Sequence, residues 1–160
     1  MYATDYDSPL GKILIAGDGE AICGVWFYGQ KHFKSTVRKD LIFNDELTIF
    51  KKATKWLDDY FKGENPEIDF KLNPKGSEFR QKVWKILREI PYGETVTYGE
   101  IAKMISPTMS AQAVGGAVGA NPISIIIPCH RVLGTNLKPT GYAGGIGRKE
   151  ELLKLEKICF

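Results

Sequence analysis

The apolar residues of this 160-residue chain change their spacing at an Asn-Pro-Lys-Gly segment, residues 73–76, and this change constrains the fold more than any other feature. Before the segment, apolar residues alternate with polar ones or form short runs, as in strands. After it, they recur every three or four residues, as in helices. Proline and glycine here favour a linker. We therefore expect an α+β protein, with an N-terminal domain of antiparallel sheet and helix at residues 1–74 and a mostly helical C-terminal domain at residues 75–160.

The N-terminal pattern predicts a hairpin, one helix and a further strand. Apolar stretches at residues 11–16 and 21–28 flank a Gly-Asp-Gly-Glu turn, as in two paired strands. Helical spacing over residues 45–61 predicts a helix that Gly63 ends. Residues 68–72 alternate in polarity, which predicts a strand.

The C-terminal pattern predicts several helices. Ser77 can cap a helix that ends before the Pro-Tyr-Gly segment at residues 91–93. Thr-Tyr-Gly-Glu at residues 97–100 matches a capping box for a helix over residues 98–105. Small residues then predict a helix over 111–120. These last two helices have the outline of a helix-turn-helix, although small-residue helices also occur wherever helices pack closely.

Composition excludes several classes of protein. The chain is 43% apolar and long enough to bury a core without disulfides. It has no apolar run of membrane-spanning length and no signal-peptide pattern, which disfavours membrane insertion and secretion. Cys23, Cys129 and Cys159 lack Cys-x-x-Cys spacing, so neither a disulfide framework nor a zinc site is indicated. We expect a cytoplasmic protein that binds no metal and no cofactor.

Acidic residues are missing from one long segment. Residues 101–149 contain five basic residues, no Asp or Glu, and eight of the 17 glycines. Such a segment predicts either a surface that meets a polyanion or a buried region that needs no acids. Charge alone does not separate these two interpretations.

Cys129 is the candidate nucleophile. Ser-Ile-Ile-Ile at residues 124–127 has the pattern of a buried strand, which Pro128 must end because proline lacks an amide donor. A free thiol is mostly protonated at pH 7, so a reactive cysteine needs a base or cation beside it. His130 and Arg131 follow Cys129 directly. Neighbouring side chains of extended backbone point opposite ways, so the thiol and imidazole would couple through a turn or a bridging water.

A carboxylate should orient the imidazole of His130, as in other catalytic triads. Because the nearby segment has no acids, the candidates lie in a helix predicted over residues 148–157: Glu150, Glu151 and Glu156. The alternative for Cys129 is a buried, unreactive thiol, which is the expected state of Cys23. His32, among lysines, is expected in a solvated loop. Tyr142, between glycines, suits a lid over a flat ring.

Several of these motifs together resemble the O6-alkylguanine-DNA alkyltransferases. Pro-Cys-His-Arg-Val at residues 128–132 is preceded by Ala-Val-Gly-Gly-Ala at 113–117 and Gly-Ala-Asn-Pro at 119–122, and is followed by Gly-Tyr-Ala-Gly-Gly at 141–145. The resemblance covers about residues 77–157, with a looser likeness before them. Blocks of this kind in this order are highly specific.

The resemblance implies a DNA repair enzyme, a methylated-DNA–protein-cysteine methyltransferase. After base flipping, the alkyl group of O6-alkylguanine in duplex DNA would pass irreversibly to Cys129, in a single turnover. His130 would act as the base through water, Glu156 would orient it, Asn121 would tie the turn and Tyr98 would offer its hydroxyl to the guanine. The substrate pocket would be lined by Gly141, Tyr142, Ala143 and the backbone of Val132.

The resemblance also implies a monomer that binds double-stranded DNA containing O6-alkylguanine through the helix near residue 111, in the minor groove. The DNA-binding residues implied by position are Tyr98, Ala111, Gln112, Ala113, Gly115 and Arg131. Gln112 stands where the family usually has an arginine that fills the gap left by the flipped base.

Two other functions remain open on the residues alone. A cysteine hydrolase using Cys129, His130 and a glutamate would turn over through an acyl-enzyme. A DNA-binding regulator would need only the helix-turn-helix, and replacing Cys129 would change nothing.

Overall fold

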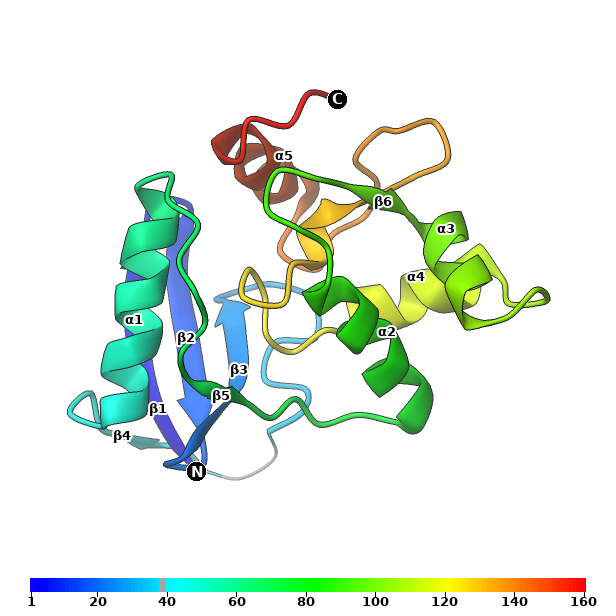
Figure 1. Ribbon diagram of the computed structural model, residues 1–160. Helices are drawn as coiled ribbons and strands as arrows, with labels where there is room; N and C mark the ends of the chain where they lie inside the picture. The colour runs from blue at the N-terminus through cyan, green and yellow to red at the C-terminus, as the bar shows by residue number, and fades with distance from the viewer. Residues whose placement is uncertain (38–39) are drawn as a thin grey trace.

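A computed structural model describes residues 1–37 and 40–160, and its N-terminal part is a five-stranded sheet covered by a helix (Figure 1). Its long antiparallel strands are β1 (Tyr2–Ser8), β2 (Gly11–Gly17) and β3 (Ala21–Phe27). Short parallel strands extend both edges, β4 (Ile42–Phe43) beside β1 and β5 (Lys71–Leu72) beside β3. Helix α1 (Thr48–Phe61) packs on the sheet through its apolar side.

The predicted hairpin is confirmed, and its turn has a clear physical cause. The carboxylate of Asp18 accepts hydrogen bonds from the amides of Glu20 and Ala21, both at 2.9 Å, and Gly19 takes a left-handed conformation. Strand β1 was not predicted, because polar Asp5 and Asp7 interrupt its apolar pattern. The strand predicted over residues 68–72 is shorter than expected, since only β5 pairs.

The C-terminal part contains the predicted helices, which confirms the α+β fold class. These are α2 (Glu78–Arg88), α3 (Tyr98–Ile105), α4 (Ala111–Gly119) and α5 (Ile146–Leu155). The side chains of Ser77, Thr97 and Ser110 each accept a hydrogen bond from the amide three residues later, so polar caps start the first three helices. A short parallel pair, β6 (Val96–Thr97) and β7 (Val132–Leu133), lies beside them.

The prediction of a strand at residues 124–127 is wrong. The segment is a series of turns in which the Ile126 amide bonds to Ser124 O at 2.8 Å and Ile125 has a left-handed φ of 71°. The start of this segment is hydrogen-bonded to β3: the Val25 amide donates to Pro122 O, and Val25 O accepts from the Ser124 amide. A run of β-branched residues suggests a strand, but this site favours a compact turn.

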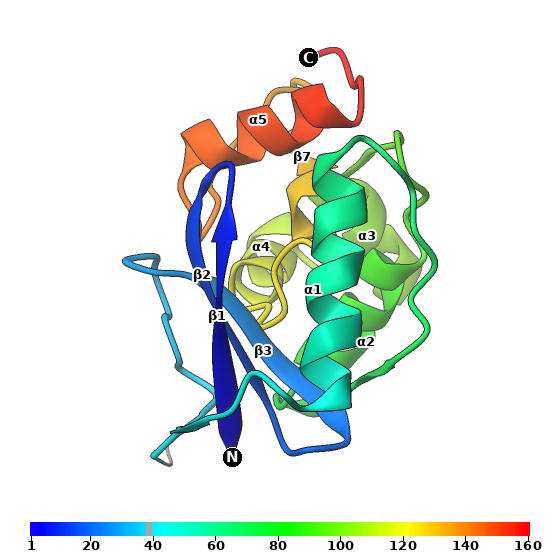
Figure 2. The ribbon, with the colours of Figure 1, turned by 90° about the vertical axis from the view of Figure 1, so that its left-hand side faces the viewer.

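One hydrophobic core runs through both parts of the molecule. It joins Ile13 and Phe27 of the sheet to Trp84 of α2 and Val114 of α4, and the Trp84 indole donates to Ala117 O at 2.8 Å. Helix α5 lies across the end of the β1–β2 hairpin (Figure 2). Among the described residues, no helix has the length and apolar character needed to cross a membrane.

Candidate active site

Cys129 begins a short 3-10 turn, Cys129–Arg131, which follows the irregular segment and leads into β7. The Asn121 side chain holds this segment from within: Nδ2 donates to Ile127 O at 2.9 Å, and Oδ1 accepts from the Ile123 amide at 3.0 Å. Asn121 therefore lies where we expected it, tying the turn that presents the cysteine.

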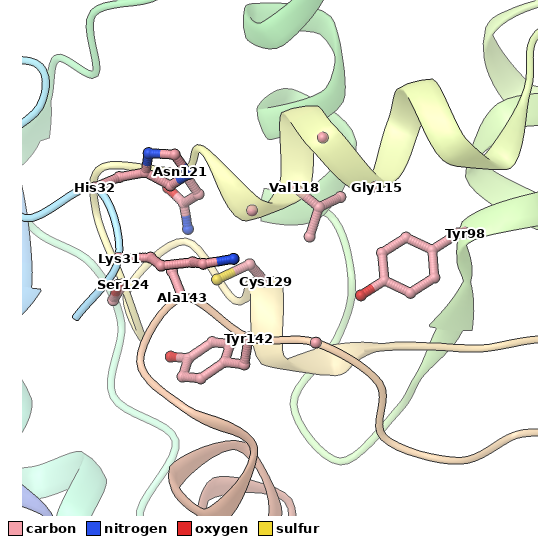
Figure 3. Close-up of a pocket in the computed structure, with 13 residues that line it drawn as sticks. Lys31, His32, Tyr98, Gly115, Val118, Asn121, Ser124, Cys129, Tyr142 and Ala143 are labelled. Atoms are coloured by element: carbon pink, nitrogen blue, oxygen red, sulfur yellow. The ribbon is translucent and has the colours of Figure 1, made fainter.

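Cys129 opens into a cavity of about 500 Å³, within the range of small-molecule sites (Figure 3). Figure 3 shows Asn121 and Tyr142 on opposite sides of the thiol, with the Tyr98 hydroxyl turned toward the cavity. The walls come from α3, α4, the loop around residue 142 and a loop after β3, and contain no acidic residue among those described. The lining residues are Lys31, His32, Tyr98, Gly115, Gly116, Val118, Gly119, Asn121, Ser124, Cys129, Gly141, Tyr142 and Ala143.

His130, the residue after Cys129, belongs to a buried hydrogen-bond network centred on Glu156. Its Nε2 is 2.6 Å from Glu156 Oε2. Tyr60 of α1 donates to the same oxygen at 2.6 Å, and Arg131 Nε donates to Oε1 at 2.8 Å. Of the three glutamates in the predicted helix, Glu156, at the end of α5, is thus the one that meets His130, and it is the one that the resemblance implies.

The network sets the charges of its members. Burial alone would raise the pKa of Glu156, but hydrogen bonds from His130, Arg131 and Tyr60 outweigh it and lower that pKa to about 2. Burial lowers the pKa of His130, and the nearby carboxylate only partly offsets this. At pH 7 the carboxylate is therefore ionised and the imidazole is neutral.

The neutral imidazole of His130 is set up to act as a base. Because Nε2 faces an ionised carboxylate, the ring proton belongs on Nε2, which leaves the lone pair on Nδ1. Nδ1 is buried and has no hydrogen-bond partner in the described part of the chain. A buried ring nitrogen without a partner is suited to a proton acceptor.

Cys129 itself is a protonated thiol at rest. Burial raises its pKa, although the Asn121 side chain and the positive charge of Lys149 act in the opposite direction. Reaction at this sulfur therefore requires a base to remove its proton.

Lys149 is a fully buried cation beside Tyr98. Its ammonium donates to Thr140 O at 2.8 Å and Gly141 O at 3.3 Å, and lies 3.4 Å from the Tyr98 hydroxyl. Burial lowers its pKa to about 8. Lys149 thus fixes the start of the loop that carries Tyr142 and contacts the hydroxyl that faces the cavity.

The residues expected at DNA gather mostly on one surface. Ala111, Gln112 and Ala113 are exposed at the start of α4, and Gly115 lies next to the ring of Tyr98, where an added Cβ would come within 3.8 Å. Helix α4 therefore presents glycines to the cavity, beside the Tyr98 ring of α3.

Two expected site residues are placed differently. Arg131 is 8% exposed, and its guanidinium bonds to Glu156 and, at 2.7 Å, to Ile90 O, so it supports the buried network and is not exposed as the other expected DNA-binding residues of α4 are. Val132 is fully buried in β7 and is not among the described residues that line the cavity.

Sequence reasoning missed several residues of the site, including the cavity-lining Gly116, Val118, Gly119 and Ser124. Tyr60 lies on the apolar side of α1, where it looks like an ordinary core residue. Lys149 lies in a run of charged residues that is typical of an exposed surface, so the sequence around neither residue indicates a role in the site. Lys31 and His32 reach the cavity from a loop after β3. His32 is exposed, as expected of a solvated loop residue, and also lines the site.

Comparison with protein families matches both parts of the chain. Residues 78–158 match the model described as 6-O-methylguanine DNA methyltransferase, DNA binding domain, and residues 1–74 match its ribonuclease-like domain. A methylated-DNA–protein-cysteine methyltransferase of Methanosarcina acetivorans is 50% identical over 99% of this chain and 100% of its own length. One of Haemophilus influenzae is 45% identical over 100% of this chain and 88% of its own length.

Solved structures of similar proteins share the fold. Mycobacterium tuberculosis OGT in complex with DNA superimposes with a TM-score of 0.88 at 44% identity, covering 98% of this chain and 93% of that one. An O6-methylguanine DNA methyltransferase of Methanococcus jannaschii gives a TM-score of 0.67 at 29% identity, covering 98% and 95%.

Proposed function

Because the chain belongs to the 6-O-methylguanine DNA methyltransferase family, we propose that it repairs O6-alkylguanine in duplex DNA by transferring the alkyl group irreversibly to its own Cys129. The observation that carries the proposal is a thiol that opens into a cavity and is followed directly in the chain by a neutral, carboxylate-bound imidazole. An unreactive buried cysteine would need neither the cavity nor the base.

The thiol proton leaves first. His130 Nδ1 accepts it through a water molecule, and the imidazolium formed is stabilised by the adjacent Glu156 carboxylate. The positive charge of Lys149 favours the resulting thiolate. Deprotonation therefore needs no residue from outside the described network.

The thiolate then displaces the guanine. Sγ bonds to the alkyl carbon, the bond from that carbon to O6 breaks, and its electron pair stays on the guanine. The Tyr98 hydroxyl, held at the cavity by Lys149, stabilises the charge that develops on the leaving base. The product is a thioether, which water does not cleave, so each molecule reacts once.

The target atom lies inside the duplex, so the nucleotide must flip out at a cost of a few kcal/mol. We propose that α3 and α4 form a helix-turn-helix and that the exposed Ala111, Gln112 and Ala113 approach the minor groove. Small side chains allow the backbone to come close to the DNA, and basic residues of the C-terminal part contact phosphates.

We also propose that the linker at residues 73–76 separates two domains, 1–74 and 75–160, and that the protein acts as a cytoplasmic monomer. The linker position lies between the two family matches. The free Cys23, Cys129 and Cys159 are consistent with a reducing compartment.

Intact-mass measurement tests the function directly. After mixing with duplex DNA that contains O6-methylguanine, the protein should gain one methyl group per molecule, located on the peptide that carries Cys129. Continuous turnover without a stable adduct would indicate a hydrolase, and binding without any adduct would indicate a regulator.

Tyr98→Phe should slow the transfer step roughly 10- to 100-fold at saturating DNA, because only the hydroxyl near the leaving base is lost. The affinity for DNA should change little, since the ring still packs beside Gly115. Single-turnover kinetics at several DNA concentrations separate the two quantities. Tyr92→Phe, which removes a surface hydroxyl bonded to Gly63 O, is the matched control. Equal losses in rate and affinity would show that Tyr98 acts through DNA contact.

Gln112→Arg should tighten DNA binding. A guanidinium can stack in the vacated base position and add a charge near the phosphates, whereas the exposed Gln112 amide adds none. We expect the slope of log affinity against log salt to steepen by up to about 0.9. Fluorescence anisotropy at several salt concentrations measures both effects. Gln81→Arg, which adds the same charge at an exposed position of α2, is the control. Equal behaviour of the two variants would show that residue 112 does not occupy the position of the flipped base.

A further inference from the structure

The side chain of Arg148 connects the cavity loop at residues 140–145 to the N-terminal sheet. Arg148 lies in the first turn of α5, and its Nη1 donates to Gly144 O at 3.0 Å. Its Nε donates to Leu10 O at 2.9 Å, in the turn between β1 and β2. One guanidinium therefore joins the end of the cavity loop to the hairpin, two segments more than 130 residues apart in sequence.

Packing around Phe27 strengthens the same connection. The guanidinium carbon of Arg148 lies 4.4 Å from the centroid of the Phe27 ring, which is fully buried at the end of β3. The Phe27 ring also packs on Gly144, where an added Cβ would come within 3.1 Å of it. Beyond it, the Lys31 amide donates to Ala143 O at 3.1 Å. The N-terminal part thus contacts three parts of the loop region: Ala143, Gly144 and Arg148.

Arg148 joins two segments through hydrogen bonds to backbone carbonyl oxygens and not through an ion pair. In the described part of the chain no carboxylate lies within ion-pairing distance of it. Two of its three guanidinium nitrogens, Nε and Nη1, each donate to a carbonyl oxygen, which fixes the distance between their segments. Lys149, the next residue, holds Thr140 O and Gly141 O at the other end of the loop.

We propose that Arg148 is a positioning residue for alkyl transfer, which fixes Tyr142 and Ala143 against Cys129 by attaching their loop to the N-terminal sheet. The proposal rests on the proposed function of Cys129. Tyr142 and Ala143 form the wall of the cavity facing the thiol (Figure 3), so a loop that is held less firmly would misplace the bound base relative to Sγ. Displacement reactions are sensitive to such errors, because a shift of about 1 Å can cost roughly 100-fold in rate.

Arg148→Met tests this inference, because methionine keeps an unbranched stem that can pack on Phe27 but has no donor for either carbonyl. With duplex containing O6-methylguanine under single-turnover conditions, the rate at saturating DNA should fall roughly 10- to 100-fold. The dissociation constant should stay unchanged, because Ala111–Gly119 lies on another wall of the cavity. Hydrogen exchange should quicken at the amides of residues 141–145. Arg148→Lys, which can reach one of the two carbonyls, should give an intermediate rate.

Lys154→Met is the matched control, since it removes an exposed cation from the same helix and should react as the unchanged protein does. All variants are measured at a temperature at which circular dichroism shows each fully folded. An Arg148→Met protein with the original saturating rate would overturn the inference, and so would a loss confined to DNA affinity. Failure of the unchanged protein to alkylate Cys129 would instead overturn the proposed function.

Discussion

Replacing Cys129 with serine should abolish alkyl transfer while DNA binding persists. A serine hydroxyl ionises far less readily than a thiol, and the nearby imidazole cannot make it an effective nucleophile for a saturated carbon. Cys129 is 6% exposed, and the exposed residues at the start of α4 do not line its cavity, so the proposed DNA-binding surface is unaltered. Intact mass should show no added methyl group after incubation with O6-methylguanine duplex, and anisotropy should show the original affinity.

Cys159→Ser is the matched control for this variant, because Cys159 is exposed near the end of the chain. It should accept one methyl group as the unchanged protein does. If the Cys129→Ser protein were methylated at Cys23 or Cys159, the assignment of Cys129 as the acceptor would fail.

Glu156→Gln should slow transfer by roughly 100-fold, because a neutral amide no longer stabilises the imidazolium that forms on His130. It should also lower stability by about 3 kcal/mol, since the buried Arg131 guanidinium loses its counter-charge. Rates are therefore compared below the unfolding transition of the variant, and stability is measured by urea unfolding. Glu151→Gln, on the exposed side of α5, should change neither quantity.

The two pH dependences of this network have definite signs. The pKa of Glu156 falls from 4.5 to about 2 on folding, so its stabilisation is complete above pH 4.5 and is lost as pH falls toward 2. Transfer should slow at acidic pH, because His130 then gains a proton. Since the pKa of His130 is lowered from its ordinary value of 6.5, this loss of rate should begin below that pH. In Glu156→Gln the acidic fall of the transfer rate should move to still lower pH, because the negative charge that favours the imidazolium of His130 is gone. A larger loss of rate in Glu150→Gln would mean that the wrong carboxylate was chosen.

Local pattern was sufficient for most of the helices and for one hairpin. Ser77, Thr97 and Ser110 start helices because each can accept an amide hydrogen bond within its own turn, a requirement contained in four consecutive residues. The strand predicted at residues 124–127 failed because its conformation depends on Asn121 and on Val25 of a distant strand. A pattern of β-branched residues contains neither of those partners.

The sequence by itself indicated Cys129 and His130 as the proposed reactive pair, and its pattern limited the orienting carboxylate to three glutamates, of which the resemblance implies Glu156. Only the tertiary structure showed the contact itself, since Glu156 meets His130 by the path that α5 takes across the molecule. It also decided the roles of Arg131, which points into the buried network, and of Arg148, which reaches Leu10 on the opposite part. The physical reason is that these side chains satisfy hydrogen-bonding groups far away in sequence, and the spacing of neighbouring residues carries no information about such partners.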